Sequence, residues 1–397
     1  MPLIHIGDML HHAYANRYAI AAFDVVSLDF VDAVISAAEA QQAPIIISLA
    51  ESHFEYFDFE RLMSAVVQAA NKTSAPVAIH LDHGTSLGSA VTAINLGCTS
   101  VMVDASSLPL EENISRTQAV VQMAHACGIP VEGELGYVPG VEGEDAERHP
   151  GEVVYTTVTD AKAYVDATGV DFLAVSIGTV HGRMKGEPKL DFERLAEING
   201  SLGIPLVIHG GTGLSDSQFR RLIDNGVAKL NYYTALADAA GRCIHDNAQR
   251  LGPAGYMDLM KGVAEAVQEE AMRCIGLWGS CGQARALLAE CRPWQPVAHV
   301  IVYNTEGLDD EGVEGMMAEG RRVLSQIPGV TEVFTGHAIQ EQAQYRHCWV
   351  VRFTDASVID SYRDHPEHKK FADQRFRPHA GGRLSIDYLD SSPGAGT

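Results

Sequence analysis

Short apolar runs alternate with amphipathic segments between residues 19 and 234. The runs are continuous and rich in β-branched residues, which is typical of strands buried on both faces. We expect strands at residues 19–26, 43–50, 77–84, 100–106, 130–136, 172–180, 205–212 and 228–234. Segments with helical spacing lie between them, at residues 29–41, 59–71, 110–127 and 160–168. This repeated strand–helix order predicts a parallel sheet with right-handed crossovers.

The number of expected strands matches a closed (β/α)8 barrel, an α/β fold that typically needs about 250 residues. An open doubly wound sheet is the alternative. However, the glycine motif GxGxxG of dinucleotide-binding sheets does not follow the first strand. We therefore predict a (β/α)8 TIM barrel over residues 1–290, with Ala-rich helices in residues 235–290.

The pattern changes after Pro293 and Pro296, which mark a domain boundary. Strands are expected at residues 299–304, 330–338, 347–353 and 383–388, and helices at residues 310–326 and 356–363. This β-α-β-β-α-β order predicts a ferredoxin-like α+β domain over residues 296–390.

Composition narrows the function classes. The 397 residues include 29 Lys and Arg against 51 Asp and Glu, a formal net charge of −22. Such an excess of negative charge disfavours nucleic-acid and membrane partners. The N-terminus lacks the pattern of a secretory signal, and no apolar run approaches the roughly 20 residues of a membrane span. The seven cysteines are scattered without a CxxC pair, which indicates reduced thiols and a cytoplasmic protein.

Polar side chains gather at the carboxyl ends of the expected strands, where barrel enzymes hold their catalytic groups. His83, His181 and His209 lie at the ends of three different strands, each next to a glycine. A single histidine at a strand end is more often structural. Three imidazoles at one height of a barrel can converge and leave an open position, as a catalytic zinc requires. His80 alternates with Asp82 and is expected in the core or beside the site, outside the metal set.

Glycines follow the seventh expected strand, at Gly210, Gly211 and Gly213. They are either turn residues or part of a phosphate-binding nest of backbone amides. Lys229 is the only lysine near a strand end here, and we interpret it as a solvated charge or an outer phosphate contact.

Five motifs, in their order and spacing, resemble the class II zinc-dependent ketose-bisphosphate aldolases, in particular the tagatose- and fructose-bisphosphate branch. They are HLDHG (80–84), VEGELG (131–136), SIGTVHG (176–182), VIHGGTG (207–213) and KLNYYT (229–234). The resemblance covers residues 1–287 and implies reversible aldol cleavage of a phosphorylated ketose, with a dihydroxyacetone-phosphate-type donor. It implies Zn²⁺ as cofactor, with Co²⁺ or Mn²⁺ as alternatives and a monovalent cation as an additional option.

The resemblance also implies roles for individual residues. His83, His181 and His209 match the metal ligands, and Asp104 and Glu134 match an alternate or second metal position. The family's two proton-transfer residues match Asp82, which acts at the aldehyde-derived oxygen, and Glu142, which acts at the hydroxymethyl carbon. Glu142 lies in the acidic, Gly-rich loop 137–148, a candidate lid. The positions that match contacts to the donor's phosphate and carbonyl end are Gly182, Gly210, Gly211, Thr212, Gly213, Asn231, Tyr233 and Thr234.

Three departures from the family pattern border the donor and acceptor pockets. The stretch 104–107 reads DASS where the family has DGSH, Thr212 replaces serine or alanine, and Tyr233 is much bulkier than the usual residue. Two alternatives therefore stay open. One is a metal-dependent lyase or aldolase that acts on a non-phosphorylated oxo-acid or polyol-derived substrate, and the other is a non-catalytic sugar-phosphate sensor.

Residues 296–390 resemble the stress-responsive dimeric α/β-barrel family. The match rests on residues 299–303, on the cluster from Tyr362 to His368 and on the order of elements. Such domains pair two sheets, so a homodimer or homotetramer contact is the favoured role. Family members that are polyketide cyclases use residues matching His299, Tyr362 and His368. A cyclase or isomerase that acts on the aldolase product is therefore the second hypothesis.

Overall fold

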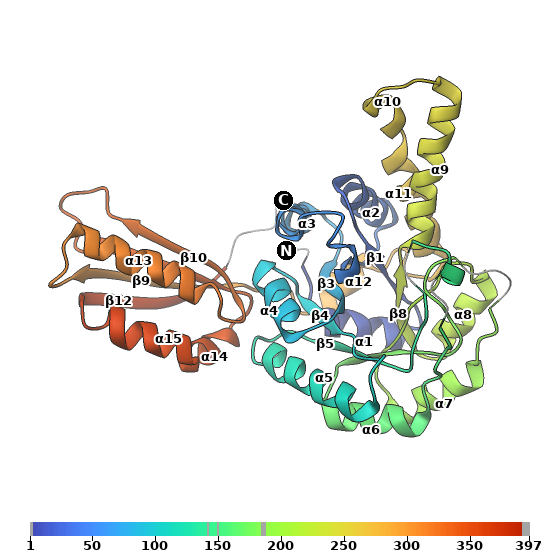
Figure 1. Ribbon diagram of the computed structural model, residues 1–397, viewed down its shortest axis with the longest axis horizontal. Coiled ribbons are helices and arrows are strands. Elements are labelled where there is room, and N and C mark those ends of the chain that lie inside the picture. The colour runs from blue at the N-terminus through green and yellow to red at the C-terminus, as the bar shows by residue number, and fades with distance from the viewer. Residues whose placement is uncertain (1–2, 141–142, 149–150, 184–187, 391–397) are drawn as a thin grey trace.

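The computed structural model describes residues 3–140, 143–148, 151–183 and 188–390. Eight parallel strands close into a barrel in which each strand pairs with the next and β1 pairs with β8 (Figure 1). They are β1 (Ile20–Asp24), β2 (Ile45–Ala50), β3 (Val77–Gly84), β4 (Ser100–Val103), β5 (Val131–Leu135), β6 (Phe172–Val175), β7 (Leu206–Ile208) and β8 (Val227–Tyr232). Helices cover the outside of every strand, so nearly all strand residues are buried. The predicted (β/α)8 barrel is confirmed.

Most of the outer helices begin where the sequence supplies a capping side chain. Asp58, Ser86, Thr157, Asp191 and Ser215 each accept a backbone N–H at the first turn of their helix. The helices are α2 (Leu28–Gln41), α3 (Phe59–Lys72), α4 (Leu87–Leu96), α5 (Leu110–His125), α6 (Val158–Thr168), α7 (Phe192–Leu202) and α8 (Asp216–Asp224). Within the part of the chain that the structure describes, no helix is both long enough and apolar enough to cross a membrane.

Helix α1 (Ile6–Asn16) seals the amino-terminal end of the barrel. Its residues Ile6, Met9 and Leu10 are fully buried and pack in one cluster with the first residues of the strands, among them Ile20 and Phe172. Access to the barrel is therefore left to the carboxyl ends of the strands. The helices that follow β8 are α9 (Thr234–Leu251), α10 (Tyr256–Met260), α11 (Val263–Leu277) and α12 (Ala284–Glu290), and α9, α10 and α11 form an arm that projects from the barrel (Figure 1).

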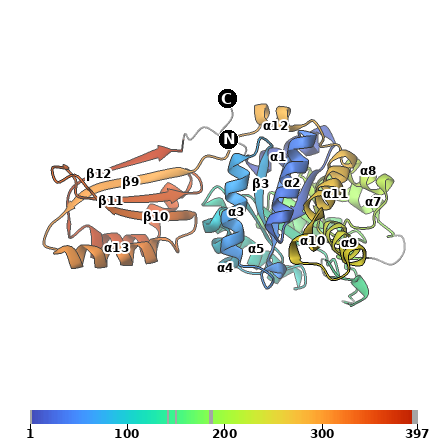
Figure 2. The same cartoon turned by 90° about the horizontal axis from the view of Figure 1, so that it is seen from above.

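A second, antiparallel sheet follows, with strand order β10-β11-β9-β12. Its strands are β9 (Val297–Thr305), β10 (Val330–His337), β11 (His347–Phe353) and β12 (Ala380–Leu389). One face is covered by α13 (Asp310–Leu324), α14 (Val358–Asp364) and α15 (Pro366–Phe371), continued by a π-helical turn at Ala372–Phe376 (Figures 1 and 2). This order and topology confirm the predicted ferredoxin-like unit. The other face leaves large apolar side chains exposed, at Phe334, Leu384, Ile386 and Tyr388.

The second sheet lies beside the barrel and not over the carboxyl ends of its strands (Figures 1 and 2). Strand β10 contacts α4. Asn95, near the end of α4, forms hydrogen bonds with the turn before β10. The Asn95 side-chain amide donates to the carbonyls of Ser325 and Ile327, both at 3.1 Å, and its oxygen accepts the N–H of Gly329 at 2.9 Å. Because α4 ends where β4 begins, this contact lies at the amino-terminal side of the barrel.

Helix α13 packs on the second sheet through Gly320. A Cβ at this position would lie 2.3 Å from Trp349 and 2.7 Å from Phe371. We therefore expect Gly320→Ala to lower the free energy of unfolding by about 1–3 kcal/mol, the usual cost of overpacking. Gly315→Ala on the same helix is the matched control. It would meet nothing within 4 Å and should stabilise by about 0.5–1 kcal/mol. Urea unfolding followed by tryptophan fluorescence measures both variants, and equal stabilities would contradict this packing.

Candidate active site

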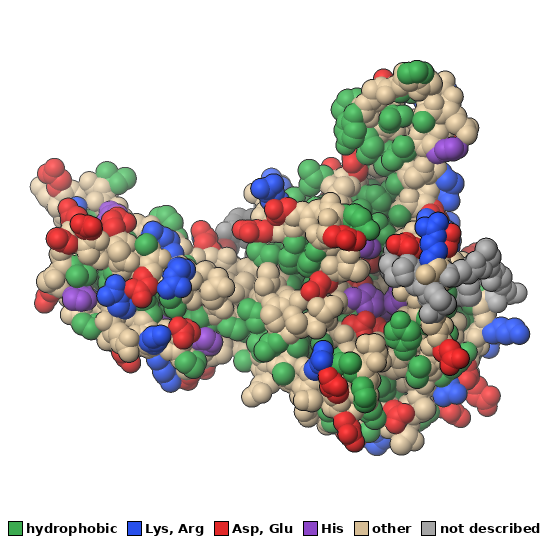
Figure 3. Space-filling model, viewed as in Figure 1, with side chains coloured by type: hydrophobic (Ala, Val, Ile, Leu, Met, Phe, Trp, Pro, Cys, Tyr) green, Lys and Arg blue, Asp and Glu red, His purple; other side chains and the backbone are tan. Residues whose placement is uncertain are grey.

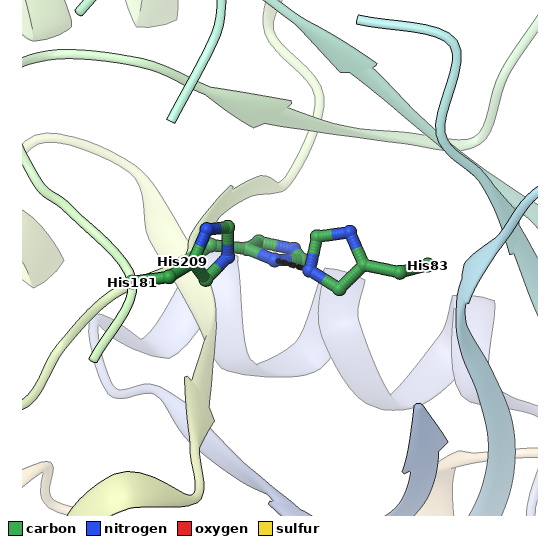
Figure 4. Close-up of side chains that lie close together, drawn as sticks. All are labelled: His83, His181 and His209. Carbon is green, nitrogen blue, oxygen red and sulfur yellow. Dashed lines mark hydrogen bonds between the residues drawn. The ribbon is translucent and has the colours of Figure 1, made fainter. Parts of the chain in front are cut away.

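Three histidine side chains meet at the carboxyl ends of β3, β6 and β7 (Figure 4). His83 Nε2 lies 2.9 Å from His209 Nδ1, and the ring centroids of His83 and His181 are 4.9 Å apart. One nitrogen from each of His83, His181 and His209 lies within 4.8 Å of the other two. Histidine side chains are visible in the face of the barrel that Figure 3 presents. The structure thus brings together the three histidines that the sequence singled out.

The second nitrogen of each imidazole is held by an oxygen acceptor. His83 Nδ1 donates to Asp104 Oδ2 at 2.8 Å, His181 Nδ1 to the Val138 carbonyl at 3.1 Å, and His209 Nε2 to Glu132 Oε1 at 3.0 Å. These bonds orient the rings, so the remaining nitrogen of each ring faces the common centre. His181 Nε2 is buried and has no partner among the described residues.

This donor set fits a divalent metal ion. Nitrogens about 2.0–2.1 Å from a tetrahedral zinc lie roughly 3.3 Å apart, close to the 2.9 Å between His83 and His209. Oxygen acceptors behind each ring are the usual second set of partners at such centres. A second group, His83 with Asp104 and Glu134, also offers ligand atoms within 4.8 Å of one another. It lies where the sequence predicts an alternate position.

Asp82 lies beside the histidines, with 1% of its surface exposed. Asn231 Nδ2 donates to Asp82 Oδ1 at 2.8 Å, and Asp82 Oδ2 is 3.9 Å from His83 Nε2. Burial by itself would raise the pKa of Asp82, but the charges of His83, His209 and Lys229 hold it well below the ordinary range. The carboxylate is therefore ionised at neutral pH. It is positioned to exchange a proton with a group bound next to the histidines.

Two further carboxyl groups border the centre. Asp104 Oδ1 accepts the Ser106 N–H at 3.0 Å and the Ser106 hydroxyl at 2.7 Å, so the unusual DASS stretch helps to orient the partner of His83. Glu134 is buried, and its Oε2 lacks a partner among the described residues. Burial and the neighbouring charge of Asp104 raise the pKa of Glu134 well above its usual value. A cation bound beside Asp104 would favour the ionised form of Glu134 instead.

Lys229 corrects an expectation from the sequence. It is fully buried inside the barrel, and its Nζ lies 2.7 Å from Glu132 Oε2, so it is neither a solvated charge nor an outer phosphate contact. His80 is also fully buried and donates from Nδ1 to Ser100 Oγ at 2.7 Å. Of the two positions expected for His80, the core or beside the site, its full burial fits the core.

Backbone geometry at the strand ends requires several of the expected glycines. Gly210 has φ +71°, and a Cβ there would lie 2.2 Å from the Val180 carbonyl oxygen. Gly182 and Gly213 also have positive φ. Gly211 is buried and Thr212 half-buried in the same turn after β7. Glycine at position 210 therefore allows the turn its backbone conformation and its close approach to Val180.

The end of β8 faces the same region. Asn231 and Thr234 are buried, and Tyr233 is half-buried with its ring 4.5 Å from that of His53 and 6.3 Å from that of Phe30. The Thr234 hydroxyl oxygen accepts the N–H of Gly143 at 3.0 Å. The bulky residue of the KLNYYT motif therefore packs against the rings of His53, which follows β2, and Phe30, which lies on α2.

The loop after β5 lies against the segment after β6. The Pro139 carbonyl accepts the His181 N–H at 2.8 Å, and the Glu144 carbonyl accepts the Arg183 N–H at 2.7 Å. Arg183 Nε also donates to both carboxylate oxygens of Asp238 on α9, at 2.9 and 3.0 Å. Glu142, the expected proton acceptor in this loop, lies outside the described residues.

The expected C-terminal residues also come together. His299, Tyr362 and His368 line a cavity of about 350 Å³ between the second sheet and its helices. The rings of Tyr362 and His368 are 4.3 Å apart, and His299 Nδ1 lies 2.6 Å from Asp387 Oδ1. Burial lowers the pKa of His368 and raises that of Tyr362, so at neutral pH the first is a neutral imidazole and the second a protonated hydroxyl.

Comparison with known proteins matches the two parts of the chain to two families. The family described as class-II fructose-bisphosphate aldolase matches residues 4–283. The chain belongs to this family. Residues 297–390 match the stress responsive A/B barrel domain, so the predicted fusion of the two is confirmed. Aldolase function in general, and the use of a divalent metal, are properties of the class II family.

Relatives support the same assignment for the barrel. The fructose-bisphosphate aldolase of Staphylococcus aureus strain Mu50 is 36% identical over 293 residues, which cover 72% of this chain and 100% of the relative. The fructose-bisphosphate aldolase of Staphylococcus epidermidis strain RP62A has the same identity over the same length. The crystal structure of the YdjI aldolase from Escherichia coli K12 is 36% identical, covers 71% of this chain and 99% of its own, and superimposes with a TM-score of 0.64.

A cavity of about 330 Å³ lies beside the histidine cluster. Its lining residues are Glu51, Ser52, His83, Thr85, Asp104, Tyr137, Val138, Gly140 and His181. Glu51 is held in place because it accepts hydrogen bonds from Thr85 and Ser89.

Sequence reasoning missed several residues of the site. Glu132 lies in the VEGELG motif, but the resemblance gives a role only to Glu134, although the alternation of a strand places both on the same face. His53 follows β2 in the short helix Glu51–His53, is 4% exposed, and has no partner for either ring nitrogen among the described residues. Its place directly after the second expected strand could have indicated that His53 lies near the site. The ion pair of Arg183 could not be predicted, because its partner Asp238 is distant in sequence.

Proposed function

We propose that the barrel catalyses reversible aldol cleavage of a phosphorylated ketose, with a divalent metal held by His83, His181 and His209. The observation that carries this proposal is the orientation of the three imidazoles, each with one nitrogen bound to an oxygen and the other directed at a common centre. Zn²⁺ is the proposed ion, with Co²⁺ and Mn²⁺ as alternatives, because imidazole ligands suit all three. The monovalent cation stays a prediction.

Cleavage of the carbon–carbon bond leaves an enediolate whose negative charge must be stabilised. A divalent ion at the histidines supplies Lewis acidity toward the carbonyl oxygen, so no Schiff-base lysine is needed. Asp82, ionised and held by Asn231, takes the proton from the hydroxyl that becomes the aldehyde oxygen and returns it in the synthetic direction. Glu142 is proposed, from its place in the family pattern, to move the proton at the hydroxymethyl carbon. General acid–base groups of this kind typically contribute about 10²–10⁴-fold each.

The donor's phosphate is proposed to bind at the turn after β7 and the end of β8. Gly210, Gly211, Thr212 and Gly213 offer backbone amides at a strand–helix junction, the usual phosphate site of this fold. Gly182, Asn231, Tyr233 and Thr234 complete the proposed donor site. The negative net charge does not exclude an anionic substrate, since local amides and a metal outweigh distant charges.

Turnover assays test the proposal. The chain is freed of metal with a chelator and reloaded with Zn²⁺, Co²⁺ or Mn²⁺. Fructose 1,6-bisphosphate and tagatose 1,6-bisphosphate are then compared with the unphosphorylated ketoses. Metal-dependent release of a triose phosphate supports the proposal. Turnover of only unphosphorylated substrates favours the lyase alternative, and phosphate-ligand binding without any turnover favours the sensor.

The C-terminal cavity is the second candidate site. It lies in the second domain, which is proposed to span residues 296–390. The grouping of His299, Tyr362 and His368 around one cavity favours a cyclase or isomerase role, with His368 as base and Tyr362 as hydrogen-bond donor to an enol. The exposed apolar sheet face favours a homodimer through the same domain. We expect His368→Ala to change the final product or its rate of formation without changing ketose cleavage in the barrel. Identical products and rates would leave only the dimer role.

A further inference from the structure

A lysine lies fully buried inside the barrel, close to the three histidines. Lys229 on β8 is two residues before Asn231, and this strand spacing directs both side chains to the barrel interior. Its Nζ donates to Glu132 Oε2 at 2.7 Å and lies 3.4 Å from His80 Nε2. Lys229, Glu132 and His80 each have 0% of their surface exposed. A fully buried lysine is rare and needs a charged partner. We therefore ask what the Lys229–Glu132 pair does for the site.

The lysine is the centre of a continuous chain of hydrogen bonds across the barrel. On one side, His80 accepts at Nε2 and donates from Nδ1 to Ser100 Oγ at 2.7 Å. On the other side, Glu132 accepts from Lys229 with Oε2 and from His209 Nε2 with Oε1, at 3.0 Å. Both oxygens of the Glu132 carboxylate therefore have a fixed donor. This carboxylate is the group that directs His209 Nδ1 toward the other two histidines.

Other roles for Lys229 fit the structure less well. His80, Asp82 and Glu132 form a group that could hold a metal ion. The Lys229 ammonium already lies 2.7 Å from Glu132 and supplies the positive charge there. Schiff-base chemistry needs a lysine nitrogen that reaches the substrate. Lys229 does not line the cavity beside the histidines, and its nitrogen is bound to Glu132.

We propose that Lys229 is a positioning residue that sets the metal affinity of the His83–His181–His209 centre. It does so by fixing the Glu132 carboxylate, which in turn holds His209 in the tautomer and orientation that present Nδ1. This inference rests on the proposed metal centre. Without the ammonium, one carboxylate oxygen has no strong donor and a buried negative charge is uncompensated. Glu132 then no longer has one preferred orientation from which to accept the His209 N–H.

Lys229→Met tests this inference, because methionine fills a similar volume without the charge. Zn²⁺ affinity is measured for the full chain by competition with a chromophoric chelator, with the metal alone as ligand. We expect Lys229→Met to weaken Zn²⁺ binding by about 10–100-fold, the usual cost of losing a partner of a metal ligand. Lys72→Met, at an exposed lysine on α3, is the control and should bind as the parent does.

The double variant Lys229→Met/Glu132→Gln separates positioning from simple damage to the core. Its glutamine oxygen can still accept the His209 N–H, and its amide nitrogen can donate to His80 Nε2, which lies 3.5 Å from Glu132 Oε2. No buried charge remains in this pair. We expect the double variant to bind Zn²⁺ at least about tenfold more tightly than Lys229→Met. Glu132→Gln alone, which leaves Lys229 unpaired, should bind more weakly than the double variant.

Nitrogen-15 shifts of the His209 ring in the metal-free protein give a readout that core damage alone does not move. They should report a protonated Nε2 in the parent and the double variant, and a mixture of tautomers in Lys229→Met. Parent-like Zn²⁺ affinity in Lys229→Met would overturn the inference and leave the metal centre intact. If Lys229→Met does not fold, a double variant that binds no more tightly than Glu132→Gln would overturn it equally. A parent chain that binds no Zn²⁺ would instead remove the proposed function itself.

Discussion

Replacement of His181 by alanine is expected to lower Zn²⁺ affinity by more than about 100-fold, since loss of even an outer partner of a metal ligand costs about 10–100-fold. His181 Nε2 is buried and has no partner among the described residues, and the proposed metal ion would satisfy it. Ketose cleavage should fall by at least about 10³-fold, because Lewis-acid stabilisation is worth several kcal/mol and each 1.4 kcal/mol is tenfold in rate. Metal content is measured by elemental analysis and turnover by release of triose phosphate.

His11→Ala is the matched control for this experiment. His11 is an exposed histidine on α1, hydrogen-bonded to the Gly7 carbonyl at the closed end of the barrel. It should keep parental metal content and turnover. A His181→Ala variant that still bound Zn²⁺ at parental affinity would show that the imidazoles converge for a structural reason and not for a metal.

The barrel could be predicted because its strands are continuous apolar runs in a regular order. The predicted strands 100–106, 172–180 and 205–212 nevertheless extend past the observed ends of β4, β6 and β7, at Val103, Val175 and Ile208. The extra residues leave the sheet because they form the site, where Gly178 and Gly210 take positive φ. Apolar composition alone does not separate a strand from the functional segment that continues it.

The candidate site was predictable where a residue's place on one strand decides its role. His83 lies at the end of β3, His209 directly after β7 and His181 in the segment that follows β6, so closure of the barrel brings them together. The surroundings of Lys229 could not be predicted in this way, because Lys229 on β8 pairs with Glu132 on β5, and sequence position alone does not show which strands face each other across the barrel. The environment of His53 could not be predicted for the same reason, because its ring packs against that of Tyr233, 4.5 Å away and distant in sequence.

Helix α1 has a clear pattern in the sequence, although the elements expected above do not include it. Helix α1 carries Ile6, Met9, Leu10 and Ala13 at helical spacing, and all four are buried against the barrel. By contrast, Asp387 gave no signal in the sequence. It meets His299 only because β12 pairs with β9 in a register that places the two residues opposite each other.

Asp82→Asn is expected to reduce the rate of ketose cleavage by about 10²–10⁴-fold, the contribution of a general acid–base group. The amide keeps the shape of the carboxylate and can still accept the hydrogen bond from Asn231 Nδ2. It cannot take up a proton at neutral pH, whereas the carboxylate is ionised because His83, His209 and Lys229 lower its pKa against the effect of burial. The change should therefore appear in kcat, with KM and Zn²⁺ affinity within a few-fold of the parent.

Asp104→Asn is the informative comparison, because Asp104 acts through His83 and not on the substrate. It accepts the His83 Nδ1–H at 2.8 Å, so its loss should weaken Zn²⁺ binding by about 10–100-fold. Saturating Zn²⁺ should restore much of the Asp104→Asn turnover and none of the Asp82→Asn turnover. This difference separates a residue that moves a proton from one that orients a ligand. If added Zn²⁺ restored both variants equally, Asp82 would belong with the metal ligands, and the proton at the aldehyde-derived oxygen would need another acceptor.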